Sequence, residues 1–369
     1  MTALKTAPTT ATPAPRDVVR HILEAARWAP SGDNTQPWRF EIVDDAHVVI
    51  HGSDTRSHCV YDLDGRPSQI AIGALMETLC IAASSMATVV SISRRQGLPD
   101  TTPTFDLHFT PAPGMAADPL AAWITRRSVQ RRPMQTRALR STEKSALEAC
   151  IGSDYQIEWL EGLGARWRTA LLMFRNAKLR LTLPEAYRTH VAVIEWHAQF
   201  SHDRVPDQAL GVDAVTTRAM QWIMGSWERV RFINRYLGGT LAPRIQMDLI
   251  PGLACGAHFV LLAARPPQDI DDYVAGGRAM QRFWLMAASL GLQLQPELTP
   301  LIFSRYAREG LPFSAQQEMN AKGPEVARQL DALVGAKAAR HSVFMGRIGE
   351  GPPAAARSLR RPLDSLIRH

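Results

Sequence analysis

The sequence predicts an α+β protein made of two related halves, and three observations lead to this prediction. Helical and strand-like hydrophobic periods alternate along the chain. The segment 72–86 aligns with 277–291, so that a long helix with a small-residue face and an Ala-Ala-Ser ending occurs twice, which suggests an internal duplication. The 369 residues are 46% hydrophobic and 21% charged, a globular composition that provides a sizeable core and excludes a largely disordered chain.

Charge and cysteine content limit the class of function. The chain has 42 Lys and Arg against 35 Asp and Glu, a formal charge of +7, and the acidic residues are interspersed. This favours anionic small molecules over nucleic acid, which would need a denser basic stripe. The four cysteines are far apart and form no CxxC pair, so we expect a reducing, cytoplasmic location. The longest apolar run, 249–264, is interrupted by Pro251 and Gly252, so no membrane span is expected.

The first half follows a Thr/Ala/Pro-rich tail, residues 1–15, that we expect to be disordered. Residues 16–120 form the first predicted half. Its helices are expected at 17–29, where Pro30 ends the pattern, and at 68–85. Strands are expected at 39–43, 48–51 and 105–109, and 111–119 reads as a linker.

The second predicted half covers residues 121–369. It opens with a basic stretch, followed by helices at 141–150, with Ser141 as N-cap, and at 166–181. A strand at 258–264 and a helix at 270–290 come later. Between them, residues 185–244 form a predicted helical insertion, in which the Trp- and Met-rich part 221–236 is expected to pack on the core or to act as a lid.

The sharpest local signal is Ala29-Pro-Ser-Gly-Asp-Asn-Thr-Gln-Pro-Trp38, a rigid polar loop between a helix and a strand. Its neutral donors and acceptors suit a heteroaromatic ligand with carbonyl groups and ring nitrogens. The same residues could instead form a helix end and an Asx-turn beside a buried Trp.

This loop resembles the flavin-binding motif APSxxNxQPW of the nitroreductase family. Two further segments are similar to that family: Arg126-Arg-Ser-Val-Gln-Arg-Arg-Pro133, and Arg360-Arg-Pro-Leu363 after a Gly-containing turn at Arg347–Gly349. The helix 276–290 and the loop Gly291–Pro296 resemble the late helix of the family and the loop beside its flavin. Taken alone, the basic segments could be solvated faces, a nucleic-acid patch or a basic tail.

The order of these segments resembles a fused tandem pair. In the family, Arg-Arg-Ser precedes the loop, and two subunits share each flavin; here it follows the loop by roughly ninety residues. We therefore expect a nitroreductase-like fold in which two homologous halves assemble one site and the second site has decayed. The chain would be a monomeric pseudo-dimer or would form a further homodimer.

The resemblance implies FMN as cofactor, because the family ligand ends at a monophosphate, with NAD(P)H as a possible co-substrate. The implied cofactor-binding residues are Pro30, Ser31, Gly32, Asn34, Gln36, Arg126, Arg127, Ser128, Gln295, Pro296, Glu297, Arg360 and Arg361. Guanidinium groups suit the phosphate, which carries a charge of roughly −1.5 to −2. No protein acid or base is named, because the flavin carries the chemistry.

One position departs from the family pattern. The family has a cation near the flavin pyrimidine, before the strand that corresponds to 258–264, whereas this chain has Leu249–Leu253 there, with Arg244 the nearest cation. The acidic and histidine residues of 190–203 lack an HExxH pattern, so a solvated helix is favoured over a metal site. Ser141–Lys144 matches SxxK but reads as a helix start.

The sequence therefore predicts an oxidoreductase that passes electrons from NAD(P)H through FMN to a small-molecule acceptor. Two alternatives remain: a protein that sequesters flavin without turnover, and a biosynthetic flavin dehydrogenase with a dedicated substrate.

Overall fold

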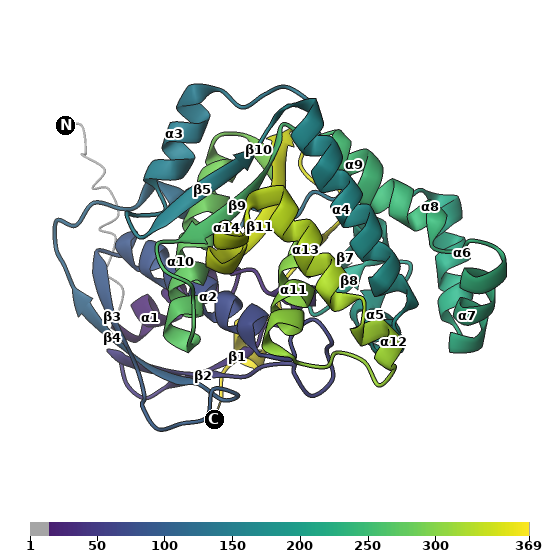
Figure 1. Ribbon diagram of the computed structural model, residues 1–369. Helices are drawn as coiled ribbons and strands as arrows, with labels where there is room; N and C mark the ends of the chain where they lie inside the picture. The colour runs from purple at the N-terminus through teal and green to yellow at the C-terminus, as the bar shows by residue number, and fades with distance from the viewer. Residues whose placement is uncertain (1–14, 369) are drawn as a thin grey trace, which may run out of the picture.

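A computed structural model describes residues 15–368, and it has the mixed α+β architecture (Figure 1). The expected tail, 1–15, lies outside these residues except for Pro15, which begins the first helix. Two four-stranded antiparallel sheets flank a central pair of long helices, α2 (Arg66–Ser84) and α10 (Ile270–Ser289). No helix of the described part is long and apolar enough to cross a membrane.

The first sheet has the strand order β1-β2-β4-β3 and is built from residues 38–111. Its strands are β1 (Trp38–Ile42), β2 (His47–Gly52), β3 (Thr88–Arg94) and β4 (Thr104–Pro111), and α1 (Pro15–Ala26) packs with α2 on its core. The predicted strands and helices of this half are confirmed within a few residues. Strand β3 was not predicted, because the face that carries Val89, Ser91 and Ser93 is exposed and the strand has no continuous apolar run.

The second sheet has the order β10-β11-β9-β5. Its strands are β5 (Tyr155–Leu160), β9 (Ala257–Ala263), β10 (Leu292–Pro296) and β11 (Ser342–Glu350). The predicted turn at Arg347–Gly349 is wrong, because these residues lie inside β11, opposite Gln293–Gln295. The glycines serve close strand packing: a Cβ on Gly349 would lie 2.8 Å from the Gly256 nitrogen.

Helices cover the second sheet and fill the connections. They are α3 (Ser141–Ala149), α4 (Gly162–Thr182), α9 (Ile250–Leu253), α11 (Thr299–Glu309), α12 (Gln317–Asn320), α13 (Gly323–Val334) and α14 (Ala336–His341). Ser141 is the first residue of α3 rather than its N-cap. Arg140 takes that position, and its backbone N–H donates to the Glu143 carboxylate at 2.7 Å.

The insertion 185–244 is largely helical, as expected, but part of it is exposed. It contains α5 (Pro184–Val193), the short strands β6 (Ile194–Glu195), β7 (Phe200–Ser201) and β8 (Val205–Pro206), and the helices α6 (Ala214–Met224), α7 (Trp227–Tyr236) and α8 (Leu241–Arg244). The expected packing of 221–236 on the core is wrong. Helices α6 and α7 project from the body (Figure 1), and Trp222 is 60% exposed.

The chain finally returns to the first sheet. Strand β12 (Arg357–Ser358) pairs in parallel with β7, and then the backbone N–H of Phe40 donates to the Leu366 carbonyl at 2.9 Å. Residues 357–368 therefore cross from the second half to the edge strand β1, beside the predicted ligand loop.

Candidate functional site

The loop 30–36 has an unusual backbone. Asp33, Asn34 and Gln36 all have positive φ values, of 49°, 61° and 50°, although none is glycine. Such conformations cost free energy and persist where the surroundings hold them. The Ser31 hydroxyl accepts a hydrogen bond from the Gln36 backbone N–H at 3.0 Å, which closes the loop on itself. Pro30 is buried and Gly32 is exposed.

The side chains of Asn34 and Gln36 point at peptide groups. Gln36 Nε2 donates to the His202 carbonyl at 3.0 Å, and its Oε1 accepts from the Arg361 backbone N–H at 2.9 Å. Asn34 Nδ2 donates to the Arg204 carbonyl at 3.3 Å, while its Oδ1 is buried without a partner. The predicted ring contacts are thus engaged by residues far away in the sequence.

The segment 199–209, which we call the strap, supplies the two carbonyl groups of these contacts, those of His202 and Arg204. The Arg357 N–H donates to the Gln199 carbonyl at 3.0 Å and the Leu359 N–H to the Ser201 carbonyl at 2.7 Å. Arg131 Nη1 also donates to the Ala209 carbonyl at 3.1 Å. The strap therefore lies between the loop 30–36, the basic segment 126–133 and the residues 357–361.

Two buried arginines and one half-buried arginine gather behind the loop, and we call Arg127, Arg357 and Arg360 the arginine cluster. Arg127 Nη2 donates to the Trp28 carbonyl at 3.0 Å, and Arg360 Nε donates to the Ala29 carbonyl at 2.8 Å. Arg357 Nη2 donates to the Arg127 carbonyl at 3.2 Å. The Nε atoms of Arg127 and Arg357 are buried without a hydrogen-bond partner.

The charges that act on the arginine cluster are all positive. Burial, and then the neighbouring charges of Arg360 and Arg357, hold the pKa of Arg127 well below its ordinary value. Burial, with the charges of Arg357 and Arg27, lowers the pKa of Arg360 to about 9. No carboxylate of the described residues compensates the three guanidinium groups, so the cluster has the charge of an anion-binding site.

The other predicted phosphate residues lie nearer the surface. Arg126 is exposed, with its guanidinium carbon 5.2 Å from the centre of the Trp123 ring, and Ser128 is partly buried. Arg361 Nη2 lies 3.3 Å from the Asp203 carboxylate of the strap. Sequence reasoning missed Arg357, which the Pro- and Ala-rich run before it concealed.

Gln295 and Pro296 end β10, and Glu297 follows in the interior. The Glu297 carboxylate lies 2.7 Å from His258 Nδ1 and 3.4 Å from Arg347 Nη1. Burial lowers the pKa of His258, but the charge and hydrogen bond of Glu297 outweigh burial and raise it to about 10. Arg347 Nη2 donates to the Arg131 carbonyl at 2.7 Å, which connects this group to the basic segment.

Other arginines lie close enough to the loop 30–36 to affect its acidic residue, whereas Arg244 does not. Arg244 Nε donates a hydrogen bond to the Phe174 carbonyl at 2.8 Å. Instead, Arg131 and Arg180 carry the charges that act on Asp33 of the loop, whose pKa is nevertheless raised by burial. Arg131 lies in the basic segment 126–133 but was not among the predicted site residues, and Arg180 belongs to no recognisable motif.

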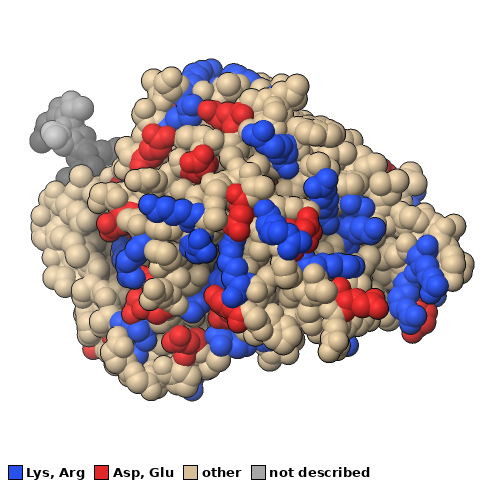
Figure 2. Space-filling model, viewed as in Figure 1, with Lys and Arg blue, Asp and Glu red and all other residues tan. Residues whose placement is uncertain are grey.

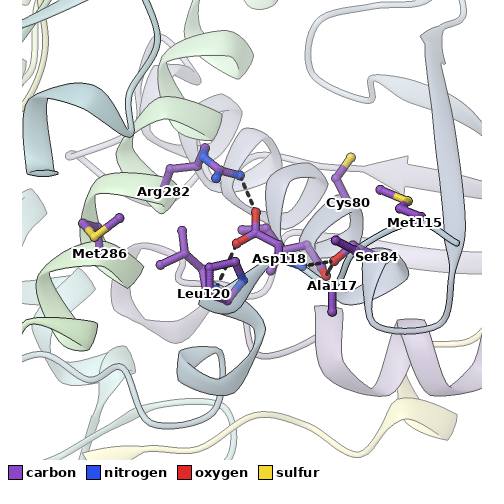
Figure 3. Close-up of a pocket in the computed structure, with 11 residues that line it drawn as sticks. Cys80, Ser84, Met115, Ala117, Asp118, Leu120, Arg282 and Met286 are labelled. Atoms are coloured by element: carbon purple, nitrogen blue, oxygen red, sulfur yellow. Dashed lines mark hydrogen bonds and ion pairs between the residues drawn. The ribbon is translucent and has the colours of Figure 1, made fainter.

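Two cavities lie near these elements. One of about 870 Å³ is bounded by residues 129–133, by part of the insertion between 197 and 221, and by 352–356. The other, of about 490 Å³, lies between α2, α10 and residues 115–120 (Figure 3). Arg282 reaches Asp118 across it at 3.0 Å, and burial raises the pKa of the Cys80 thiol there. None of the predicted cofactor-binding residues lines this second cavity.

The surface and the remaining polar residues add little to the site. On the face shown in Figure 2, basic and acidic side chains alternate. Within residues 15–368, no group of three or more His, Cys, Asp or Glu side chains has the arrangement of a metal site.

The loop 30–36 lies in the part of the chain that matches a known protein family. Residues 10–65 match the sequence model of the nitroreductase family. The uncharacterized protein MT1398 of Mycobacterium tuberculosis (strain CDC 1551 / Oshkosh) is 24% identical over 379 residues, which cover 99% of this chain and 50% of that protein. The chain thus spans about half the length of the curated relative that it matches.

Two solved structures are also similar. The nitroreductase-like family protein from Bacillus cereus is 13% identical, with a TM-score of 0.35 over 69% of this chain and 97% of that one. The FMN-dependent nitroreductase NfnB from Mycobacterium smegmatis, in complex with NADPH, is 14% identical, with a TM-score of 0.34 over 68% of this chain and 97% of that one. These low scores carry no argument about the site. The match to the nitroreductase family is therefore confined to residues 10–65, which contain the loop 30–36.

Proposed function

We propose that the protein is an FMN-binding oxidoreductase that passes electrons from NAD(P)H to a small-molecule acceptor. The observation that carries this proposal is the arginine cluster, a largely buried set of cations that no carboxylate within residues 15–368 pairs with, directly behind the loop 30–36. The FMN-dependent relative from Mycobacterium smegmatis, which was solved with NADPH, is compatible with this cofactor pair.

The residues of the cluster fit a phosphate. Arg127 and Arg357 each have a buried Nε without a partner, and a phosphate monoester offers several strong acceptor oxygens. Its charge of roughly −1.5 to −2 would offset most of the unpaired positive charge. An internal diphosphate would need a second cationic group in line, so the monophosphate FMN is the better match.

The division of labour follows from these positions. When bound, FMN supplies the hydride and electron transfer chemistry. Arg127, Arg357 and Arg360 would hold its phosphate, and the loop 30–36, fixed by its strained backbone, would orient the ring end. Peptide groups of the strap would shield the site from water. No protein acid or base is assigned.

The strap also favours a second candidate function. Residues 202–204 engage Asn34 and Gln36, the two side chains expected to contact the flavin ring. An oxidoreductase must admit NAD(P)H and an acceptor to the ring, whereas a protein that sequesters flavin benefits from a closed strap. A dehydrogenase with a dedicated substrate would need the strap to open for that substrate alone.

Flavin binding and reduction test the proposal directly. The purified protein is loaded with FMN, desalted, and its visible absorption is recorded before and after anaerobic NADH or NADPH. About one flavin per chain that bleaches supports the oxidoreductase. Retained flavin that does not bleach supports sequestration or a dedicated dehydrogenase, and a protein that takes up no FMN refutes the proposal.

Variants locate the phosphate site. Arg127→Met and Arg357→Met should each weaken FMN binding by at least tenfold, because each removes a charge-assisted contact. The matched control is Arg235→Met, an exposed arginine of α7 whose guanidinium lies over Tyr236. Equal FMN affinity in Arg127→Met and the control would place the phosphate elsewhere.

A further inference from the structure

A polar site of different character lies on helix α4, and it was not predicted from the sequence. Asn176 and Arg180 are one turn apart on this helix, so their side chains share a face. The helix packs on the π-helical turn η4 (Ile245–Leu249), which carries Asp248. Asn176 is 1% exposed and Asp248 is 5% exposed. Single π-helical turns are frequent at functional positions.

Several polar atoms of these three residues have no partner. Asn176 Nδ2 and Oδ1, Arg180 Nε and Asp248 Oδ2 are all buried without a hydrogen bond. The one contact among the three residues is the ion pair between Arg180 Nη2 and Asp248 Oδ1, which at 3.5 Å is longer than a hydrogen-bonded pair. Buried polar groups in folded proteins are nearly always satisfied, so four orphaned atoms on two adjoining elements indicate that something polar binds there.

The charges around this site favour an anion. The positive charge of Arg180 lowers the pKa values of Asp33, Asp248 and Tyr61, against the effect of burial. The Tyr61 hydroxyl lies 3.0 Å from His190 Nε2. Arg347 also acts on Asp248. Glu297 is already held by His258 and Arg347, so it does not neutralise Arg180. Burial raises the pKa of Asp248 to about 6, so its carboxylate is ionised at neutral pH and can accept a hydrogen bond from a donor beside Arg180.

We propose that Asn176, Arg180 and Asp248 bind the carboxylate end of the substrate, as an α-hydroxy or α-amino acid group, beside the loop 30–36. A carboxylate accepts from Arg180 Nε and Asn176 Nδ2 together. A hydroxyl or amino group next to it donates to Asp248 Oδ2 or Asn176 Oδ1. This inference rests on the proposed function in one respect: it makes the bound acid the substrate of the flavin.

Binding of matched small acids tests the site without turnover. Isothermal titration calorimetry compares three nitroaryl probes: 4-nitromandelate, 4-nitrophenylacetate, which lacks the hydroxyl, and methyl 4-nitromandelate, which lacks the charge. The FMN-treated protein should bind 4-nitromandelate at least tenfold more tightly than the ester, with 4-nitrophenylacetate in between. Equal affinity for acid and ester overturns the proposal.

Variants of Arg180 and Asn176 test whether these residues cause the preference for the acid over the ester. Arg180→Met should abolish the preference for acid over ester, whereas Arg175→Met, on the exposed side of the same helix, should keep it. Asn176→Leu should weaken binding of the acid. If Asn176 were merely a buried structural residue, Asn176→Leu would raise the unfolding temperature and leave binding unchanged, which also refutes the proposal.

Flavin content separates the two proposals. The Arg180→Met variant should keep its FMN, because the phosphate is assigned to the arginine cluster. Loss of FMN from this variant would make Arg180 a cofactor residue and overturn the substrate site. A wild-type protein that binds no FMN but prefers the acid would refute the proposed function and leave the acid site standing.

Discussion

Replacing Gly73 with alanine should force the two central helices apart. A Cβ on Gly73 would lie 2.0 Å from the Val274 carbonyl oxygen of α10, and contacts under 3.0 Å are essentially never seen for real Cβ atoms. The helices must therefore separate by about 1 Å, because a helical carbonyl cannot rotate away. Overpacking of this kind costs about 3 to 4 kcal/mol, at or just above the upper end of its usual range, and alanine regains about 1 kcal/mol of helix propensity. The expected loss is about 2 to 3 kcal/mol.

The reciprocal glycine provides a stricter test. A Cβ on Gly277 would lie 2.1 Å from the Ile70 carbonyl oxygen of α2, at the same helix crossing. Once the first alanine has moved the helices, the second should fit at little further cost, so the double variant should lose much less than the sum of the single losses.

Urea unfolding followed by circular dichroism measures these losses. The matched control is Gly164→Ala, a helical glycine of α4 whose Cβ would meet nothing within 4 Å, and this change should stabilise by up to about 1 kcal/mol. An unfolding midpoint of Gly73→Ala equal to that of wild type would refute the close helix contact. Strict additivity in the double variant would refute the shared displacement.

Three other predictions concern the second half. The pKa of His258 is about 10 in the folded protein and about 6.5 in the unfolded chain, so protonated His258 stabilises the fold fully below pH 6.5 and this stabilisation is lost as pH rises toward 10. Urea unfolding of the wild type should therefore show a lower free energy of unfolding at pH 9.5 than at pH 6.5. An equal loss in Glu297→Gln would contradict the pairing of His258 with Glu297. Asp203→Asn removes a half-exposed ion pair with Arg361 that is worth under about 1 kcal/mol, so trypsin should cleave after Arg204 up to about fivefold faster. Unchanged cleavage would mean that the pair does not hold the strap. The double variant Phe232→Ser, Tyr236→Ser replaces two rings that are 57% and 62% exposed, so it should change the free energy of unfolding by under about 0.5 kcal/mol. It should also reduce self-association measured by light scattering. A loss above about 2 kcal/mol would show that these rings are packed.

The sequence predicts the regular elements well where apolar periodicity decides them. The helix expected at 68–85 is observed as Arg66–Ser84, and the strand expected at 258–264 as Ala257–Ala263. Predictions failed where glycine has a packing role. Gly349 suggested a turn at Arg347–Gly349, but Gly346 and Gly349 let β11 approach its neighbours. A Cβ on Gly346 would lie 2.7 Å from the Gln295 carbonyl oxygen.

The site could be predicted only in part, because much of it is made by tertiary contacts. The motif located Asn34 and Gln36, but nothing in their neighbourhood shows that His202 and Arg204 supply their partners. Arg127 and Arg360 were found as motif residues. Arg357 and Arg180 become conspicuous only through burial, since an arginine in sequence is normally a surface residue.

The hydrogen bond from Arg360 to the Ala29 carbonyl joins residues 331 positions apart. During synthesis, the loop therefore leaves the ribosome long before the arginine that completes it. At typical elongation rates this interval is roughly 15 to 65 seconds. Throughout it, the first sheet also lacks the backbone partners that residues 366–368 give to Phe40. The first half must wait with an open sheet edge, so its folding in the cell depends on protection of that edge until translation has passed residue 368.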